Sequence, residues 1–307
     1  MSQTSIAFVF PGAAVEPCGA EAAFYARHED IMRPFLVKAS SVAGTDLVDI
    51  LNEGMLGQLD ERSNQLFTFA YSHGVAQAHM DAGISPAVAA GYSLGIYAAV
   101  SVSGAVRFDE SLGIVGTAFD IMKAQCAADT FGMGAIIGLS EEETLRILAS
   151  GEYSSVCRTN TNNETCGVFS GLKDDMGRFF NEARGHGALS TVTFRVSVPY
   201  HHPRYIAAAS QTFLDALQTL SWRDAEIPII SSINQAPLVK AADLVKFLSQ
   251  NLASPVHWQK VAETIARRGA TIVYECGPGI SLCQNNRFIP NHLRYVTIKK
   301  SVRRDPV

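Results

Sequence analysis

Residues 91–95 read Gly-Tyr-Ser-Leu-Gly, a G-x-S-x-G pattern that leaves the backbone around Ser93 few possible conformations. An apolar stretch at 86–91 precedes it and an alanine-rich stretch at 94–101 follows, which predicts a strand, a sharp turn and a helix. The two glycines let such a turn lift the serine Oγ out of the backbone, at a helix N-terminus that favours an oxyanion. We therefore predict a nucleophilic Ser93; the alternative is a helix-capping serine without reactivity.

Further apolar segments extend this unit into an α/β fold. Residues 5–10 predict a buried parallel strand, which Pro11 and Gly12 end. A helix is predicted over 63–82, with Ser63 as its N-cap. Helices over 205–220 and 256–268 and strands over 227–233 and 271–275 complete the predicted larger unit.

Residues 129–195 show a different pattern from the rest of the chain. Their predicted elements follow the order strand, helix, strand, strand, helix, strand, which is typical of a ferredoxin-like unit. We therefore predict a small α+β domain at 129–195, inserted into a larger α/β domain that is formed by 1–128 and 196–307.

Charge and cysteine content exclude several classes of function. The chain has 25 Lys and Arg against 29 Asp and Glu, and a net charge of −4 provides no basic field for nucleic acid. The six cysteines form no CxxC pair and no zinc-site spacing, so we expect free thiols, no metal and a cytoplasmic location. No apolar run is long enough to predict a membrane span, and the N-terminal stretch lacks the features of a signal peptide.

A serine nucleophile needs a base, and the best placed of the eight histidines are His201 and His202. Both follow Val-Ser-Val-Pro-Tyr at the end of a predicted strand, and loops at strand ends often carry catalytic groups. Adjacent side chains cannot both enter one site, so one of the two should be the partner of Ser93. We expect the six other histidines to be solvated.

Five segments together resemble the malonyl-CoA:acyl-carrier-protein transacylase family over nearly the whole chain. They are FVFPG at 8–12, GYSLG at 91–95, Val-Ser-Val-Pro-x-His at 196–201, SPVHW at 254–258 and YECGPG at 274–279. The inserted segment resembles the family at Asn160-Thr-Asn162 and Val168-Phe-Ser-Gly171. The resemblance implies an α/β-hydrolase-like large catalytic domain with an inserted ferredoxin-like α+β small domain.

The same resemblance implies roles for individual residues. Ser93 would be the nucleophile and His201 its general base, oriented by the backbone carbonyl of Asn251, where the family usually has Gln. The oxyanion hole would be formed by the backbone N–H groups of Leu94 and Ala13, although the family reads Pro-Gly-Gln-Gly where this chain has Pro-Gly-Ala-Ala. The expected pocket residues are Gln65, Tyr92, Ala118, Met122 and Tyr200.

Two departures from the family predict a different acyl group. Members that use malonyl groups carry an Arg in an R-G-x-x-M pattern, which binds the malonyl carboxylate, whereas this chain has Ala118 there. The histidine that usually precedes the nucleophile is Tyr92. Because an unpaired buried carboxylate is costly, we expect an acyl group without a free carboxylate. The alternative is that another basic residue, such as Arg195 or Arg204, reaches the pocket.

We therefore predict an acyltransferase that moves a non-carboxylated acyl group from a thioester, through acyl-Ser93, to the phosphopantetheine thiol of an acyl carrier protein. Its partners would be the carrier protein and the acyl thioester, with no nucleic acid and no membrane. No cofactor is implied, because coenzyme A or phosphopantetheine arrives as substrate. Two alternatives stay open: an editing hydrolase that releases stalled acyl chains, if water reaches the ester first, and a non-catalytic scaffold that binds the carrier protein.

Overall fold

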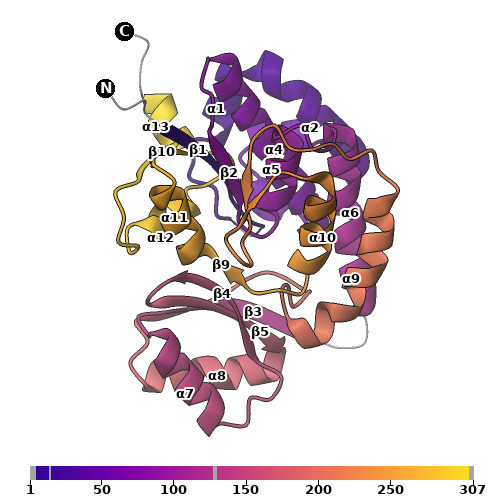
Figure 1. The fold of residues 1–307 in the computed structure, drawn as a ribbon. Coiled ribbons are helices and arrows are strands. Elements are labelled where there is room, and N and C mark those ends of the chain that lie inside the picture. The colour runs from indigo at the N-terminus through magenta and orange to yellow at the C-terminus, as the bar shows by residue number, and fades with distance from the viewer. Residues whose placement is uncertain (1–4, 14, 127–129, 304–307) are drawn as a thin grey trace.

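The computed structural model describes residues 5–13, 15–126 and 130–303, which form two β-sheets surrounded by helices (Figure 1). The larger sheet contains β1 (Ser5–Phe10), β2 (Val88–Gly91), β7 (Ile229–Ile230), β8 (Pro237–Leu238), β10 (Ala270–Glu275) and β11 (Arg294–Thr297). The smaller sheet contains β3 (Phe131–Ile137), β4 (Cys157–Asn163), β5 (Cys166–Leu172), β6 (Ser190–Thr193) and β9 (Val256–His257).

Helices cover both sheets. Those before the smaller sheet are α1 (Glu21–Arg27), α2 (Glu29–Ala43), α3 (Leu47–Asn52), α4 (Glu61–Asp81), α5 (Gly95–Val102) and α6 (Phe108–Gln125), with a 3₁₀ turn, η1, at Leu56–Gln58. The others are α7 (Glu141–Ser150), α8 (Lys173–Gly185), α9 (Pro203–Gln218), α10 (Ala241–Asn251), α11 (Trp258–Arg267), α12 (Ser281–Asn286) and α13 (Ile298–Arg303). Within the described residues, no helix combines the length and the apolar character needed to cross a bilayer.

The larger sheet brings the ends of distant strands together. Its order is β11-β10-β1-β2-β7-β8, and all neighbours are parallel except β7 and β8. The strand β2 and most of β1 are buried, as expected for a parallel sheet covered by helices on both faces. Phe10 pairs with Gly91 at the carboxyl ends of β1 and β2, so the loop after Phe10 lies beside the turn after Gly91.

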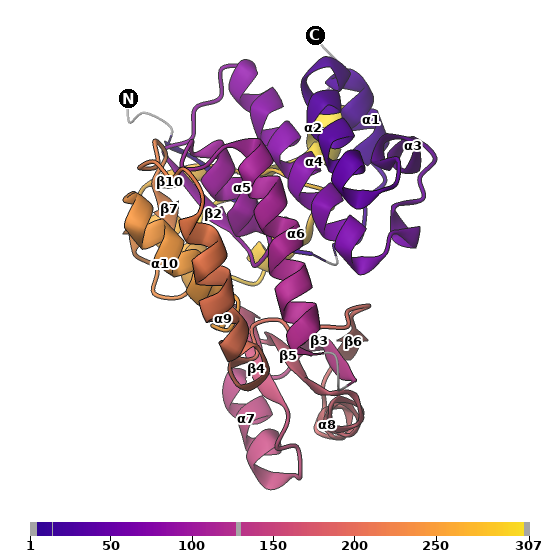
Figure 2. The same ribbon diagram turned by 90° about the vertical axis from the view of Figure 1, so that its right-hand side faces the viewer.

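The smaller sheet has the predicted element order β3, α7, β4, β5, α8, β6, and α7 and α8 cover one of its faces (Figures 1 and 2). This order and the parallel larger sheet confirm the predicted fold class. The short strand β9 was not foreseen: it comes from the C-terminal part of the chain and pairs with β4, which joins the two units. The domain boundaries stay a prediction, and the one between 128 and 129 lies outside the described residues.

The start of α4 differs from the sequence prediction. Asp60 is the N-cap, and its carboxylate accepts hydrogen bonds from the N–H groups of Arg62 and Ser63. The hydroxyl of Ser63 itself donates to Asp60. The prediction of Ser63 as the cap was wrong because the helix begins three residues earlier than expected, where the Asp60 carboxylate accepts from the first free amides.

Three histidines, His73 and His201 buried and His79 partly buried, give folding stability a pH dependence. Burial lowers the pKa of His73, His79 and His201 to about 4 each, with a smaller contribution from His28 to that of His79. The expectation of solvated histidines is therefore wrong for His73, which is 7% exposed. An unfolded histidine titrates near 6.5, so between about pH 6.5 and 4 the unfolded chain binds more protons and stability falls on acidification.

We expect the melting temperature to fall steadily as the pH is lowered from about 6.5 to 4.5. Burial raises the pKa of Glu275 to about 7, so its contribution has the opposite sign: it is present below about pH 4.5 and is lost as the pH rises. Three histidines outweigh this one carboxyl group. Thermal melts across this range test the prediction, and His73→Phe should reduce the slope. A melting temperature that is constant or rises on acidification contradicts it.

Candidate active site

The turn between β2 and α5 holds Ser93 in a strained backbone conformation. Its φ is 53°, which is uncommon for a residue with a side chain. A Cβ on Gly91 would lie 2.1 Å from the backbone nitrogen of Ile96, and a Cβ on Gly95 would lie 2.1 Å from the carbonyl oxygen of Phe10. Close backbone approach therefore requires glycine at both positions of this turn.

The Oγ atom of Ser93 lies 2.7 Å from Nε2 of His201, although the two residues are 108 positions apart. His201 is 3% exposed and also has a positive φ, 62°, in the loop that leads into α9. The neighbouring His202 turns away: it caps α9, and its Nε2 lies 2.9 Å from the carbonyl oxygen of Ser155. The structure thus brings one histidine of the pair to the serine.

Two backbone carbonyls fix the orientation of the His201 ring. The Nδ1 atom lies 2.7 Å from the carbonyl oxygen of Asn251 and 3.1 Å from that of Ser254. Carbonyls only accept, so Nδ1 carries the hydrogen and Nε2 is free to accept the hydrogen of the Ser93 hydroxyl. Burial lowers the pKa of His201 to about 4, and the imidazole is neutral near pH 7. The pair has the arrangement of a nucleophile with its base.

Free backbone N–H groups lie next to the serine. Leu94 is the N-cap residue of α5, and Ala13 lies in the loop after β1; both line the pocket that contains Ser93. Within the part of the chain that the structure describes, neither N–H donates a hydrogen bond. Two unpaired N–H groups at the mouth of a nucleophilic site can stabilise a developing oxyanion.

A single pocket contains all the residues that the sequence analysis assigned to the site. Besides those named above, it is lined by Gln65, Tyr92, Ala118, Met122 and Tyr200. Apolar side chains, including Met133, Val168 and Phe194 from the smaller unit and the segment after it, complete the wall. No lysine or arginine is among the described residues that line it, and neither Arg195 nor Arg204 reaches it.

The hydroxyl group of Tyr92 is fully occupied by the smaller unit. It donates to Oδ1 of Asn162, at 2.7 Å, and accepts from Nδ2 of Asn160, at 2.9 Å. Its only hydrogen is therefore unavailable to a ligand in the pocket. Burial raises the pKa of Tyr92 well above its usual value, which keeps the phenol neutral.

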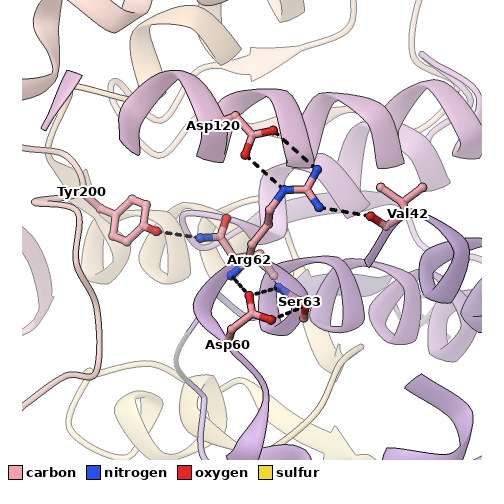
Figure 3. Close-up of polar contacts among 7 residues, drawn as sticks. Val42, Asp60, Arg62, Ser63, Asp120 and Tyr200 are labelled. Atoms are coloured by element: carbon pink, nitrogen blue, oxygen red, sulfur yellow. Dashed lines mark hydrogen bonds and ion pairs between the residues drawn. The ribbon is translucent and has the colours of Figure 1, made fainter. Parts of the chain in front are cut away.

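Arg62, the arginine of α4, is directed away from the pocket. The guanidinium of Arg62 pairs with Asp120 on α6, with Nε 3.1 Å from Oδ1, and donates to the carbonyl oxygen of Val42. Figure 3 shows Arg62 pointing toward Asp120 and Val42, with Tyr200 lying away from the guanidinium. Asp120 faces outward, two positions from the pocket residues Ala118 and Met122.

Glu21, which the sequence analysis did not single out, anchors residues 18–20, just before α1. Its carboxylate accepts hydrogen bonds from the backbone N–H groups of Cys18, Gly19 and Ala20. It also accepts one from Gly279, at 2.9 Å, in the loop after β10. Glu21 is 3% exposed, so it links two loops at the edge of the larger sheet from a buried position.

Replacing Glu21 with alanine should destabilise the protein by about 2 to 4 kcal/mol, because four backbone donors lose a charged acceptor. Chemical denaturation of Glu21→Ala beside the unmodified protein measures this difference. Glu21→Gln, which keeps one amide oxygen, should lie between the two. A loss below about 0.5 kcal/mol for the alanine variant would show that the loops do not depend on this carboxylate.

The described residues hold no group of three or more His, Cys, Asp or Glu side chains arranged to bind a metal ion. Cys18, Cys157, Cys166, Cys276 and Cys283 are free thiols, distributed over both units.

Comparison with known proteins gives consistent matches over most of the chain. Residues 27–286 match the family described as the acyl transferase domain. The malonyl CoA-acyl carrier protein transacylase of Salmonella typhimurium is 28% identical over 279 residues, which cover 90% of each chain.

Solved structures match over nearly the whole length. The malonyl-CoA:acyl carrier protein transacylase of Xanthomonas oryzae superposes with a TM-score of 0.86 at 27% identity, covering 97% of this chain and 95% of that one. A complex of a type II PKS acyl-carrier protein with its malonyl-transacylase contains a chain that matches with a TM-score of 0.87 at 25% identity, covering 96% of each.

Proposed function

We propose that this chain, which belongs to the acyl transferase domain family, transfers an acyl group without a free carboxylate to an acyl carrier protein. The donor is an acyl thioester of coenzyme A or of a carrier protein. The acceptor is the phosphopantetheine thiol. These thioesters are substrates, and the proposal includes no metal and no organic cofactor.

The proposed first half-reaction begins with Ser93. Its hydroxyl donates to Nε2 of His201, which takes the proton as Oγ attacks the thioester carbonyl. The resulting oxyanion accepts hydrogen bonds from the N–H groups of Leu94 and Ala13. Collapse of this intermediate leaves the acyl group on Ser93 and releases the thiolate of the donor. The thiolate takes the proton from His201 and leaves as a thiol.

The second half-reaction repeats these steps in reverse with a new thiol. His201 takes the proton of the carrier-protein thiol, whose sulfur attacks the acyl-Ser93 ester. The Ser93 alkoxide leaves and regains the proton from His201. The carbonyls of Asn251 and Ser254 keep the ring aligned through both halves, because they hold Nδ1–H in one orientation.

The proposed substrate class rests on one observation: no lysine or arginine is among the described residues that line the pocket. A carboxylate in this pocket would meet Ala118 and Met122, both almost fully buried, and a tyrosine hydroxyl that has no free hydrogen. Removing a carboxylate from water without a charged partner costs several kcal/mol. An acetyl, butyryl or similar acyl group carries no such cost.

Malonyl transfer is the second candidate, because the similar proteins from Salmonella typhimurium and Xanthomonas oryzae are named for it. The two candidates differ in the ratio of the kcat/KM values for malonyl and acetyl thioesters. We propose a malonyl-to-acetyl ratio well below one.

We also propose a cytoplasmic location, because the sequence has a low density of cysteines.

Competing thioesters with a carrier protein as acceptor test the proposal. The purified protein is mixed with acetyl-, butyryl- and malonyl-CoA in turn, and acyl carrier protein in its holo form is followed by mass spectrometry. Faster labelling by acetyl or butyryl groups supports the proposal, and faster malonyl labelling refutes it. Release of free acid without labelling would identify a hydrolase, and no reaction with any thioester would favour a scaffold.

A further inference from the structure

The carboxylate of Glu61, in the first turn of α4, holds the segment that carries His201. Its Oε2 atom accepts from the backbone N–H of Ser197, at 2.9 Å, and from the Ser197 hydroxyl, at 2.6 Å. Its Oε1 atom accepts from the hydroxyl of Tyr200, at 2.6 Å. Hydrogen bonds to a charged acceptor are strong, and the last of these three donors, Tyr200, directly precedes His201.

Uncharged donors alone compensate the charge of Glu61. Among the described residues Glu61 forms no ion pair, and the adjacent Arg62 is engaged by Asp120 instead, as Figure 3 shows. The side chain of Glu61 lies partly buried beside the pocket residues Gln65 and Tyr200. A negative charge therefore stands directly behind this part of the pocket wall.

Glu61 also determines which polar atoms Tyr200 offers to the pocket. Tyr200 has one hydroxyl hydrogen, which goes to Glu61, and its oxygen accepts from Nε2 of Gln65, at 2.7 Å. Burial, together with the charge of Glu61, raises the pKa of Tyr200 well above its usual value, so the phenol stays neutral. With the hydrogen of Tyr92 given to Asn162, neither Tyr92 nor Tyr200 has a hydroxyl hydrogen left for a ligand.

We propose that Glu61 is a positioning and specificity-determining residue of the acyl pocket. Its hydrogen bonds hold the segment before His201 in register with Ser93. By taking the Tyr200 hydrogen and placing a charge behind the wall, it also disfavours acyl groups that carry a carboxylate. The second part rests on the proposed function, in which the substrate is an uncharged acyl group.

Three variants separate these effects. Glu61→Gln keeps an oxygen for Ser197 but removes the charge, Glu61→Ala removes all three bonds, and Tyr200→Phe removes only the hydroxyl. Glu142→Gln is the matched control, because it makes the same change on the exposed surface of α7, where Glu142 pairs with Arg146. The kcat/KM values for acetyl- and malonyl-CoA are measured for each protein, together with its melting temperature.

The expected results differ between the variants. Glu61→Ala should lower acetyl transfer by about tenfold or more, and Glu61→Gln should recover much of that loss because it retains the bonds to Ser197. The malonyl-to-acetyl ratio should rise about threefold to tenfold in Glu61→Gln, since a repulsive charge is gone. Tyr200→Phe should leave this ratio low, because the charge remains. Glu142→Gln should match the unmodified protein within about twofold.

Two outcomes overturn the inference. One is a Glu61→Gln protein with a normal melting temperature and an unchanged malonyl-to-acetyl ratio. The other is an equal loss for both substrates in Glu61→Gln and Glu61→Ala, which would show a structural role only. A preference for malonyl in the unmodified protein would instead refute the proposed function, and the effect of Glu61 on the ratio would still be measured.

Discussion

Replacing either Ser93 or His201 with alanine should reduce acyl transfer by about a thousandfold or more, without preventing folding. The Oγ atom of Ser93 lies 2.7 Å from the buried imidazole of His201, and the described residues that line the pocket include no second histidine and no Asp, Glu or Lys. The losses should not add in the double variant, because the two side chains act as a unit. Initial rates of acyl transfer to a carrier protein measure both effects.

The control for this prediction is the neighbouring histidine. His202 is as buried as His201, but it caps α9 and contacts Ser155 instead of Ser93. His202→Asn keeps a capping side chain and should retain activity within a few-fold. A His202 variant as inactive as His201→Ala, or a Ser93→Ala protein that still transfers acyl groups, would contradict the proposed roles.

Introducing a cation at Ala118 should shift the substrate preference toward malonyl by about one to two orders of magnitude. Ala118 lines the pocket from α6 and is 2% exposed, so a guanidinium placed there lies in a dry environment where it pairs strongly with a carboxylate. The measurement is the malonyl-to-acetyl ratio of kcat/KM for Ala118→Arg. The acetyl rate should fall, because the larger side chain narrows the pocket.

Two further variants separate the effect of the charge from the effect of side-chain size. Ala118→Met adds similar bulk without charge and should not raise the ratio. Met122→Arg places the cation at a second lining position with little change in volume, and serves if Ala118→Arg is unstable. The prediction is wrong if both arginine variants fold, as melting curves show, and the ratio stays at that of the unmodified protein.

Much of the fold was predictable because its elements carry local signals. The apolar strand before Gly91, the turn and α5 were predicted within a few residues, as was the strand-helix order of the inserted unit. The family resemblance read from the motifs is confirmed by the match to residues 27–286. The edge strand β11 and the strand β9 were missed, since both are short and β9 forms only by pairing with β4 of the other unit.

The residues that support the site were much harder to predict. Glu61 and Glu21 both have the sequence context of an ordinary acidic residue in a first helical turn. Each also bonds to a segment more than a hundred residues away, Glu61 to Ser197 and Glu21 to Gly279. Single-sequence patterns contain no signal for such long-range hydrogen bonds. The roles of the predicted site residues stay predictions until they are tested by substitution.

Trapping the acyl-enzyme tests the central claim most directly. The protein is mixed briefly with acetyl-CoA or malonyl-CoA without an acceptor, digested, and its peptides are identified by mass spectrometry. We predict an acetyl group on the peptide that contains Ser93, absent from His201→Ala on the same time scale, and a much slower malonyl adduct. An adduct on any other residue, or a malonyl group on Ser93 that forms faster than acetyl, would contradict the account.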